Sequence, residues 1–168
     1  RLVGGTTFHF CRDDQRNAYD YLIVDEAGQV ALGNLVAVAG SARNIILVGD
    51  QMQLPQPVQG VHPGKSGLSS LDYLLQGRAT VSPERGILLN ESWRMHPSVC
   101  RFISDAIYDG RLSNRPHTAK RSLILGGGAH PALASAGLTM LQLDHQGFTQ
   151  GNTEEADAIV GIMDSLLK

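Results

Sequence analysis

The 168-residue sequence has little of what defines several classes of protein. It has only two cysteines, Cys11 and Cys100, and their wide separation argues against a disulfide framework and favours two reduced thiols. His9 and Cys11 approach the spacing of zinc ligands, but two ligands do not make a zinc site. The sequence has no apolar run long enough to span a membrane and no opening signal segment. We therefore expect a soluble, cytoplasmic protein with no membrane partner.

A bulk excess of positive charge is also missing, since the net charge is -2. Net charge alone therefore gives no sign of a nucleic-acid partner. The distribution is uneven: residues 78–121 carry eight Lys and Arg against four acids, and residues 122–168 carry one Lys and five acids. The basic middle suits contact with phosphate, although a solvated basic face is the commoner meaning of such a run.

With 42% hydrophobic residues, the chain could form one ordinary globular domain. However, it starts at Arg1 without an initiator methionine and ends directly after a strong helical pattern. We expect it to be a piece of a longer protein.

Acidic residues follow two apolar runs. Asp25 and Glu26 come directly after Tyr-Leu-Ile-Val, and Ile45–Val48 runs into Gly-Asp-Gln-Met-Gln at residues 49–53. Ligands of open parallel sheets bind outside the carboxyl ends of the strands, so both acidic clusters would face one crevice. Acids also end strands as solvated turn residues. Two clusters in succession favour a magnesium–nucleotide site.

The first half of the sequence alternates strand and helix patterns, which predicts a right-handed parallel crossover in an α/β fold. The expected elements are a short strand at Leu2–Val3, the two acid-tipped strands, and between those a helix over Val30–Ala39 that stops at Gly40. Dense proline and glycine then predict a loop from residue 54 to 67. Leucines at helical spacing follow and predict a helix with a core-facing stripe: Leu68, Leu71, Leu74 and Leu75.

The second half has weaker patterns. Pro97 can open a helix that continues to Tyr108 and is closed by Gly110. Short strands are expected at 87–89, 123–125 and 138–143. Asn152 is a good N-cap, with Glu155 in capping-box position. A buried stripe should then follow, made of Ala156, Ile159, Val160, Met163 and Leu167. We place a boundary between two lobes near residues 76–86.

A nucleoside triphosphatase needs a phosphate cradle, a magnesium ligand, a group that activates water, and cations for the developing charge. Asp25 would hold Mg²⁺ through a coordinated water, and Glu26 would orient and deprotonate the attacking water. The amide of Gln53 can both donate and accept, so it could contact the γ-phosphate and its water. Asp50 would support the outer shell of the metal or order its loop, and the second role is slightly favoured.

Two basic segments are less decisive. Arg94, in Glu-Ser-Trp-Arg-Met-His-Pro, could act as an arginine finger from the second lobe, although an Arg beside a Trp is more often a stacked or surface group. Gly64-Lys65-Ser66 looks like the end of a phosphate-binding loop. That loop requires glycine at residue 59, which is glutamine, and a strand directly before it. The phosphate cradle is therefore missing from the sequence.

Taken in order, Asp-Glu-Ala-Gly-Gln at 25–29, Gly-Asp-Gln-Met-Gln-Leu-Pro at 49–55 and Trp-Arg-Met-His-Pro at 93–97 resemble motifs II, III and IV of superfamily 1 helicases. They are most similar to the 5′-to-3′ branch, which includes RNA-surveillance and DNA-replication helicases. The residues of the first and third motifs, Asp-Glu-Ala-Gly-Gln and Glu-Ser-Trp-Arg-Met-His-Pro, are also similar to those of bacterial members in which the helicase follows a RecB-like nuclease domain. Asn-Thr-Glu-Glu-Ala at 152–156 resembles a helix start of the same family.

The resemblance implies a P-loop NTPase fold of the RecA-like type, a parallel sheet with flanking helices. Residues 1–80 would be the C-terminal part of a first RecA-like domain, and residues 81–168 the N-terminal part of a second. ATP and Mg²⁺ would be the cofactors, with Asp25 on the metal, Glu26 on the water, and Gly49, Asp50 and Gln53 in the nucleotide-contacting segment. Arg94 would contribute the cross-domain phosphate contact.

The same resemblance implies partners. Thr6 and Thr7 lie where the family contacts nucleic acid, so single-stranded DNA or RNA is the expected track. The remaining helicase domains, and possibly a nuclease domain in the same polypeptide, would complete the enzyme. An alternative from another class is a non-hydrolysing binding or regulatory module with the same fold. A stand-alone kinase or GTPase that uses residues 64–66 fails on the loop spacing.

Overall fold

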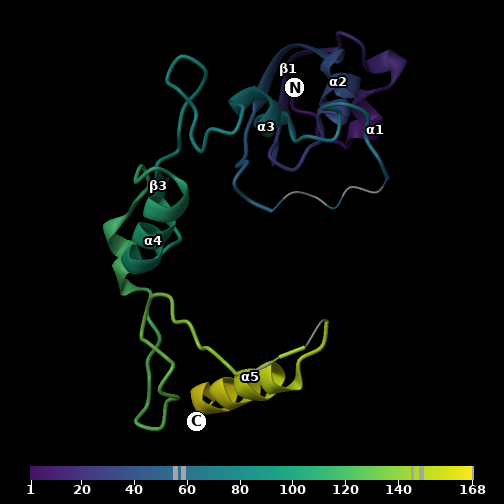
Figure 1. The fold of residues 1–168 in the computed structure, drawn as a ribbon. Coiled ribbons are helices and arrows are strands. Elements are labelled where there is room, and N and C mark those ends of the chain that lie inside the picture. The colour runs from purple at the N-terminus through teal and green to yellow at the C-terminus, as the bar shows by residue number, and fades with distance from the viewer. Residues whose placement is uncertain (55–56, 58–59, 145, 148–149, 168) are drawn as a thin grey trace. The chain divides into compact units, whose positions relative to one another are not determined.

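The structure is a computed structural model, which describes residues 1–54, 57, 60–144, 146–147 and 150–167. Its contacts divide the chain into two compact units, Arg1–Leu88 and a second unit that begins at Leu89. Among the described residues, each unit contains one pair of hydrogen-bonded parallel strands. Figure 1 shows the elements of both units.

The first unit is built on two parallel strands, β1 (Tyr19–Val24) and β2 (Ala42–Leu47). In their register, Tyr19 lies opposite Ala42 and Val24 opposite Leu47. Helix α2 (Leu32–Ala39) connects them and is followed by Gly40 as its C-cap. The predicted strand–helix–strand crossover and the α/β class with parallel strands are confirmed. Both strands begin two to three residues earlier than the apolar runs indicate.

The core of this unit lies where α2 covers one face of the sheet. Leu22, Val38 and Ala42 are its buried members. Phe10 packs against them, and its ring centroid lies 5.7 Å from that of Tyr19 in an edge-on arrangement. The core therefore joins both strands, α2 and the N-terminal segment.

The N-terminal segment is helical where it is regular, with α1 at Thr7–Phe10 and the 3₁₀ helix η1 at Asp13–Gln15. The strand predicted at Leu2–Val3 is wrong, because this stretch pairs with no strand and Leu2 is almost fully exposed. Two apolar residues have too little side-chain area to offset the ordering of an extended segment that finds no partner.

Beyond the second acidic cluster, the described residues between Leu54 and Gly67 form no helix or strand, as the prolines and glycines predict. Part of that expected loop lies outside the described residues. The leucine stripe becomes, from Leu71 on, the short helix α3 (Ser70–Leu75), capped by Ser69, whose hydroxyl accepts from the Asp72 amide. The prediction that the stripe faces a core is wrong for Leu68, which lies before the helix, and for Leu74, since both are exposed. The Ser66 hydroxyl donates to the Pro63 carbonyl at 2.9 Å within a turn, so residues 64–66 do not open a helix.

The second unit contains β3 (Glu91–Ser92), α4 (Pro97–Ile107), β4 (Ser113–Asn114), the 3₁₀ helix η2 (Pro116–Lys120) and α5 (Thr153–Leu166). β3 and β4 are two-residue parallel strands. Helix α4 begins at the predicted proline and is capped by His96, whose Nδ1 accepts from the Ser98 amide. Within α4, burial raises the pKa of the Cys100 thiol, and both cysteines of the chain are free.

Three strands predicted in this half are wrong. The segments 87–89, 123–125 and 138–143 form no strand, and Ile87, Ile124 and Met140 are each more than four-fifths exposed. A strand forms only when a neighbouring strand satisfies its backbone in a continuous ladder, and among the described residues these apolar runs have no such ladder. In 123–125, the Leu123 amide donates to the Ser135 carbonyl at 2.7 Å, and this bond does not extend into a strand.

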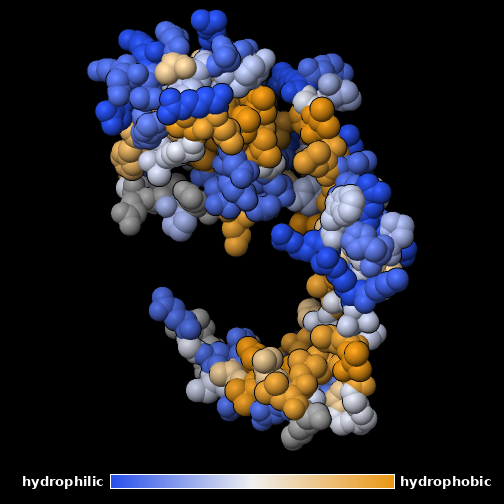
Figure 2. Space-filling view, turned by 180° about the vertical axis from the view of Figure 1, so that it is seen from behind, coloured by the Kyte–Doolittle hydropathy of each residue, from blue (hydrophilic) through white to orange (hydrophobic). Residues whose placement is uncertain are grey.

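Helix α5 forms with the predicted cap, since the Asn152 side chain accepts from the amides of Glu154 and Glu155. Its predicted buried stripe is wrong: Ile159, Val160, Met163 and Leu167 are all exposed. Figure 2 shows the apolar surface that α5 and its surroundings present. None of the helices in the described ranges is long and apolar enough to cross a membrane.

Candidate functional site

The loops that follow β1 and β2 leave the sheet at the same edge and are joined by backbone hydrogen bonds. The Val48 amide donates to the Val24 carbonyl at 2.9 Å, and the Ala27 amide donates to the Val48 carbonyl at 2.9 Å. Because parallel strands end together, this arrangement brings the segments that carry the two acidic clusters side by side.

Two glycines allow these loops to touch. A Cβ on Gly28 would lie 2.2 Å from the carbonyl oxygen of Asp50, and a Cβ on Gly49 would lie 2.7 Å from the amide nitrogen of Ala27. Gly49 also has a φ of +156°, and Ala27 is fully buried beneath the contact. A larger residue at position 28 would push the loops apart. This role of Gly28 could not be predicted from the sequence, where its only sign is a glycine two residues after the acidic pair.

Asp25 and Glu26 form the exposed turn at the end of β1. The Asp25 Oδ1 atom accepts a hydrogen bond from the Glu26 amide at 3.0 Å. Glu26 has a φ of +53°, a left-handed conformation that is uncommon for residues other than glycine. Such strain costs of order 1–3 kcal/mol and clusters at functional sites, so this turn is a candidate for function.

Asp50 orders the loop after β2. Its Oδ1 atom accepts from the Met52 amide at 3.0 Å, and its Oδ2 atom accepts from the Gln53 amide nitrogen Nε2 at 3.3 Å. The structure thus places Gln53 beside Asp50 on the loop that touches the Asp25–Glu26 turn. Gln53 is exposed, so its amide is accessible to a ligand.

Gln51 anchors the same loop and was not identified from the sequence. Its Nε2 atom donates to the carbonyls of Arg78 and Ala79 at 2.9 and 2.7 Å. These bonds tie the second acidic cluster to the segment after α3. No sequence pattern signals them, because the partners are backbone carbonyls 27 and 28 residues away.

The acids suit magnesium better than zinc or calcium. No group of three or more His, Cys, Asp or Glu side chains that could hold a metal occurs in the part of the chain that the structure describes. Magnesium does not need one, because it keeps several waters and uses one or two carboxylates together with substrate phosphates. One carboxylate at the exposed turn therefore fits this ion.

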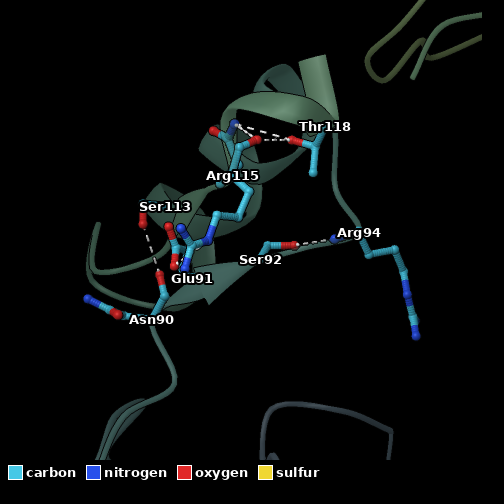
Figure 3. Close-up of polar contacts among 8 residues, drawn as sticks. Asn90, Glu91, Ser92, Arg94, Ser113, Arg115 and Thr118 are labelled. Carbon is cyan, nitrogen blue, oxygen red and sulfur yellow. Dashed lines mark hydrogen bonds and ion pairs between the residues drawn. The ribbon is translucent and has the colours of Figure 1, made fainter. Parts of the chain in front are cut away.

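The second unit holds Arg94 in the turn between β3 and α4. The Ser92 hydroxyl accepts from the amides of Arg94 and Met95, at 3.3 and 3.0 Å. Figure 3 shows the Arg94 side chain extending away from the other labelled residues. Across the described ranges, its guanidinium makes no hydrogen bond or ion pair with the protein.

Arg115 is the neighbouring cation that the protein itself neutralises. Its Nε atom forms an ion pair with Glu91 at 2.8 Å, and its guanidinium carbon lies 4.4 Å from the centre of the Trp93 ring. His117 lies on the same ring, at 5.6 Å between centroids. Trp93 therefore stacks with Arg115 and not with its sequence neighbour Arg94. The Arg94 charge is left available to a ligand.

Thr6 and Thr7, the residues expected to contact nucleic acid, lie at the start of α1. Thr6 is its N-cap, without a side-chain capping bond, and Thr7 is its first residue. Thr6 is exposed and Thr7 is half-buried, and the role of both stays a prediction.

Comparison with known proteins gives the family. A family profile described as an AAA domain matches residues 69–168, more than half of the chain, and a second AAA domain profile matches residues 3–59. The chain belongs to the AAA domain family. In this AAA domain protein, the match over residues 69–168 contains Arg94, and the match over residues 3–59 contains both acidic clusters.

The relatives of this AAA domain protein include helicases. It is 33% identical over 134 residues to the DNA replication ATP-dependent helicase/nuclease dna2 of Schizosaccharomyces pombe, covering 66% of this chain and 9% of that protein. It is 32% identical over 105 residues to the DNA-binding protein SMUBP-2 of Mesocricetus auratus, covering 61% and 10%. With helicase SEN1 of Saccharomyces cerevisiae the identity is 33% over 102 residues, covering 58% and 4%.

The chain spans a tenth or less of the length of each of these three proteins. They come from yeasts and a mammal, and they give no support to the narrower similarity to bacterial RecB-like nuclease–helicase fusions. The resemblance to superfamily 1 helicases is supported at the level of the family.

Proposed function

We propose that this chain is part of an ATP-dependent helicase or translocase that moves on single-stranded DNA or RNA. One observation carries the proposal: the acidic loops after β1 and β2 are in backbone contact at one edge of a parallel sheet. That edge is where α/β proteins bind nucleotides. Similarity to an ATP-dependent helicase/nuclease, which covers 66% of the chain, supports the same function.

The proposed roles divide among the strand-end residues. Asp25 would hold Mg²⁺ through a coordinated water, because its carboxylate is exposed at the turn and magnesium retains its waters. Glu26 would orient and deprotonate the attacking water. Gln53 would contact the γ-phosphate with its amide, and Gly49 and Asp50 would shape the loop that presents it.

When bound, Mg²⁺ supplies charge stabilisation for phosphoryl transfer. The chain itself contributes the exposed Asp25 and Glu26 carboxylates and the loop held by Asp50. Arg94 would supply a cation to the phosphates, as an arginine finger does, because no protein group of the described chain neutralises it. The phosphate cradle is absent from this sequence and would come from elsewhere in a longer protein.

The domain assignment follows from the same proposal. Residues 1–80 would be the C-terminal part of a first RecA-like domain, and residues 81–168 the N-terminal part of a second. Thr6 and Thr7 would contact the nucleic acid, mostly at phosphates and stacked bases, so binding should be tolerant of sequence and sensitive to salt.

The test is Glu26→Gln in the full-length protein that carries this chain. Nucleic-acid-stimulated ATP hydrolysis should fall by about 10²–10⁴, since general-base catalysis contributes that much, while binding of Mg-ATP is kept. Glu84→Gln, the same change at an exposed glutamate of the first unit, is the matched control. Unchanged turnover in Glu26→Gln would reject Glu26 as the base. Turnover that no single-stranded nucleic acid stimulates would reject a motor.

A further inference from the structure

Arg121 lies at the end of η2 and contacts the backbone of Arg94. Its Nη1 atom donates to the Arg94 carbonyl oxygen at 3.0 Å, across 27 residues of sequence. The Ser92 hydroxyl accepts from the Arg94 amide and from the Met95 amide, which belongs to the same peptide group as the Arg94 carbonyl. Three backbone groups around Arg94 are therefore held by side chains, while its own guanidinium stays unpaired among the described residues.

Arg121 is held in place by hydrogen bonds within the 3₁₀ helix η2. The Arg121 amide donates to the Thr118 carbonyl at 3.0 Å, and Thr118 is fully buried. The Thr118 hydroxyl donates to the Arg115 carbonyl at 2.7 Å, and Arg115 forms the ion pair with Glu91 that Figure 3 shows. One end of η2 is thus tied to β3 just before Arg94, and the other end reaches the Arg94 carbonyl.

We propose that Arg121 is a positioning residue for Arg94. It would fix the peptide group after Arg94, so that the guanidinium starts from one backbone geometry when it meets phosphate. Preorganised charge is more effective than mobile charge, because reorganisation at the moment of reaction is avoided. This inference rests on the proposed function, in which Arg94 contacts the nucleotide.

The proposal predicts a defect in turnover. In the full-length protein, Arg121→Ala should lower kcat for ATP about tenfold to a hundredfold, in line with the cost of small misplacements at reacting groups, with a smaller change in KM. Lys120→Ala is the matched control, because it removes the same charge one residue away. Arg121→Gln, which keeps an N–H donor without the charge, should recover part of the loss.

A double-mutant cycle separates positioning from a general structural role. If Arg121 acts through Arg94, then Arg121→Ala should cost nothing further in an Arg94→Ala background. As a readout independent of hydrolysis, hydrogen exchange of the peptide covering residues 92–96 should be faster in Arg121→Ala than in Lys120→Ala, with no nucleotide present.

The outcomes are distinguishable. Arg121→Ala that behaves like Lys120→Ala, while Arg94→Ala is slow, overturns the positioning role and leaves the proposed function intact. Additive losses in the cycle, or recovery by Arg121→Lys alone and not by Gln, also overturn it, because either result assigns Arg121 an action of its own. Normal turnover in Arg94→Ala removes the cross-lobe role of Arg94 and this inference with it.

Discussion

At the scale of single residues, the candidate site is defined by the close approach of Gly28 to the Asp50 backbone. The two residues lie in different loops and are more than twenty positions apart in the sequence. The absence of a side chain at position 28 lets the two loops share hydrogen bonds through Ala27 and Val48. The acids at 25 and 26 could be found from the sequence, because two adjacent carboxylates after an apolar run are a visible pattern. The hydrogen bonds by which Gln51 holds its loop could not be found from the sequence, since their acceptors are backbone carbonyls of distant residues.

Gly28→Ala should destabilise the first unit by about 1–3 kcal/mol, because the new Cβ would overlap the Asp50 carbonyl and displace backbone. Urea unfolding, followed by circular dichroism, measures this change. Gly40→Ala is the control: its Cβ would meet nothing within 4 Å and its φ of -67° suits alanine. Equal stability of the two variants would contradict the close approach of the loops.

At the scale of elements, pattern and structure agree where an element closes its own backbone bonds or has a nearby partner. The helices at 32–39, 97–107 and 153–166 form close to their predicted places. The crossover strands form because a single helix returns the chain to a parallel neighbour. The predicted strands at 2–3, 87–89, 123–125 and 138–143 fail, because a short apolar run specifies no partner.

Helix α5 offers a test at this scale. Asn152→Ala removes the acceptor for two first-turn amides and should cost about 1 kcal/mol of helix stability. This loss is expected to lower the helical signal in circular dichroism and to accelerate hydrogen exchange of the Glu154 and Glu155 amides. Asn152→Asp keeps the acceptor and should preserve both. An Ala variant indistinguishable from the Asp variant would argue against the cap.

At the scale of the whole molecule, the chain forms two units, each with a single pair of strands among its described residues. Apolar side chains on β1 and β2 remain exposed, including Tyr21, Ile23 and Ile46, as do those on α5. The sheet of the first unit is covered on one face by α2, and the burial of Leu22 and Val38 reflects that face alone. The acids therefore stand at the edge of a small sheet without a phosphate loop.

From this we expect the 168-residue chain by itself to bind Mg-ATP weakly and not to hydrolyse it. The reason is that cradle, metal, water and cations are all needed for phosphoryl transfer, and the cradle is not in the sequence. Calorimetric titration and a steady-state phosphate-release assay would check both parts. Sustained hydrolysis by the purified chain that Glu26→Gln abolishes would refute this expectation.

The sequence by itself determined the local features: the acid-tipped strands, the crossover helix, the helix start at Pro97, the cap at Asn152, and the unsuitability of residues 64–66 as a phosphate loop. Each depends on contacts within a few residues or on one short crossover. Only the tertiary structure decided which apolar runs found partners, that Gly28 meets Asp50, and that Arg121 holds the Arg94 carbonyl. Those contacts join residues far apart in the chain, and their energies depend on which backbone groups and surfaces meet after folding.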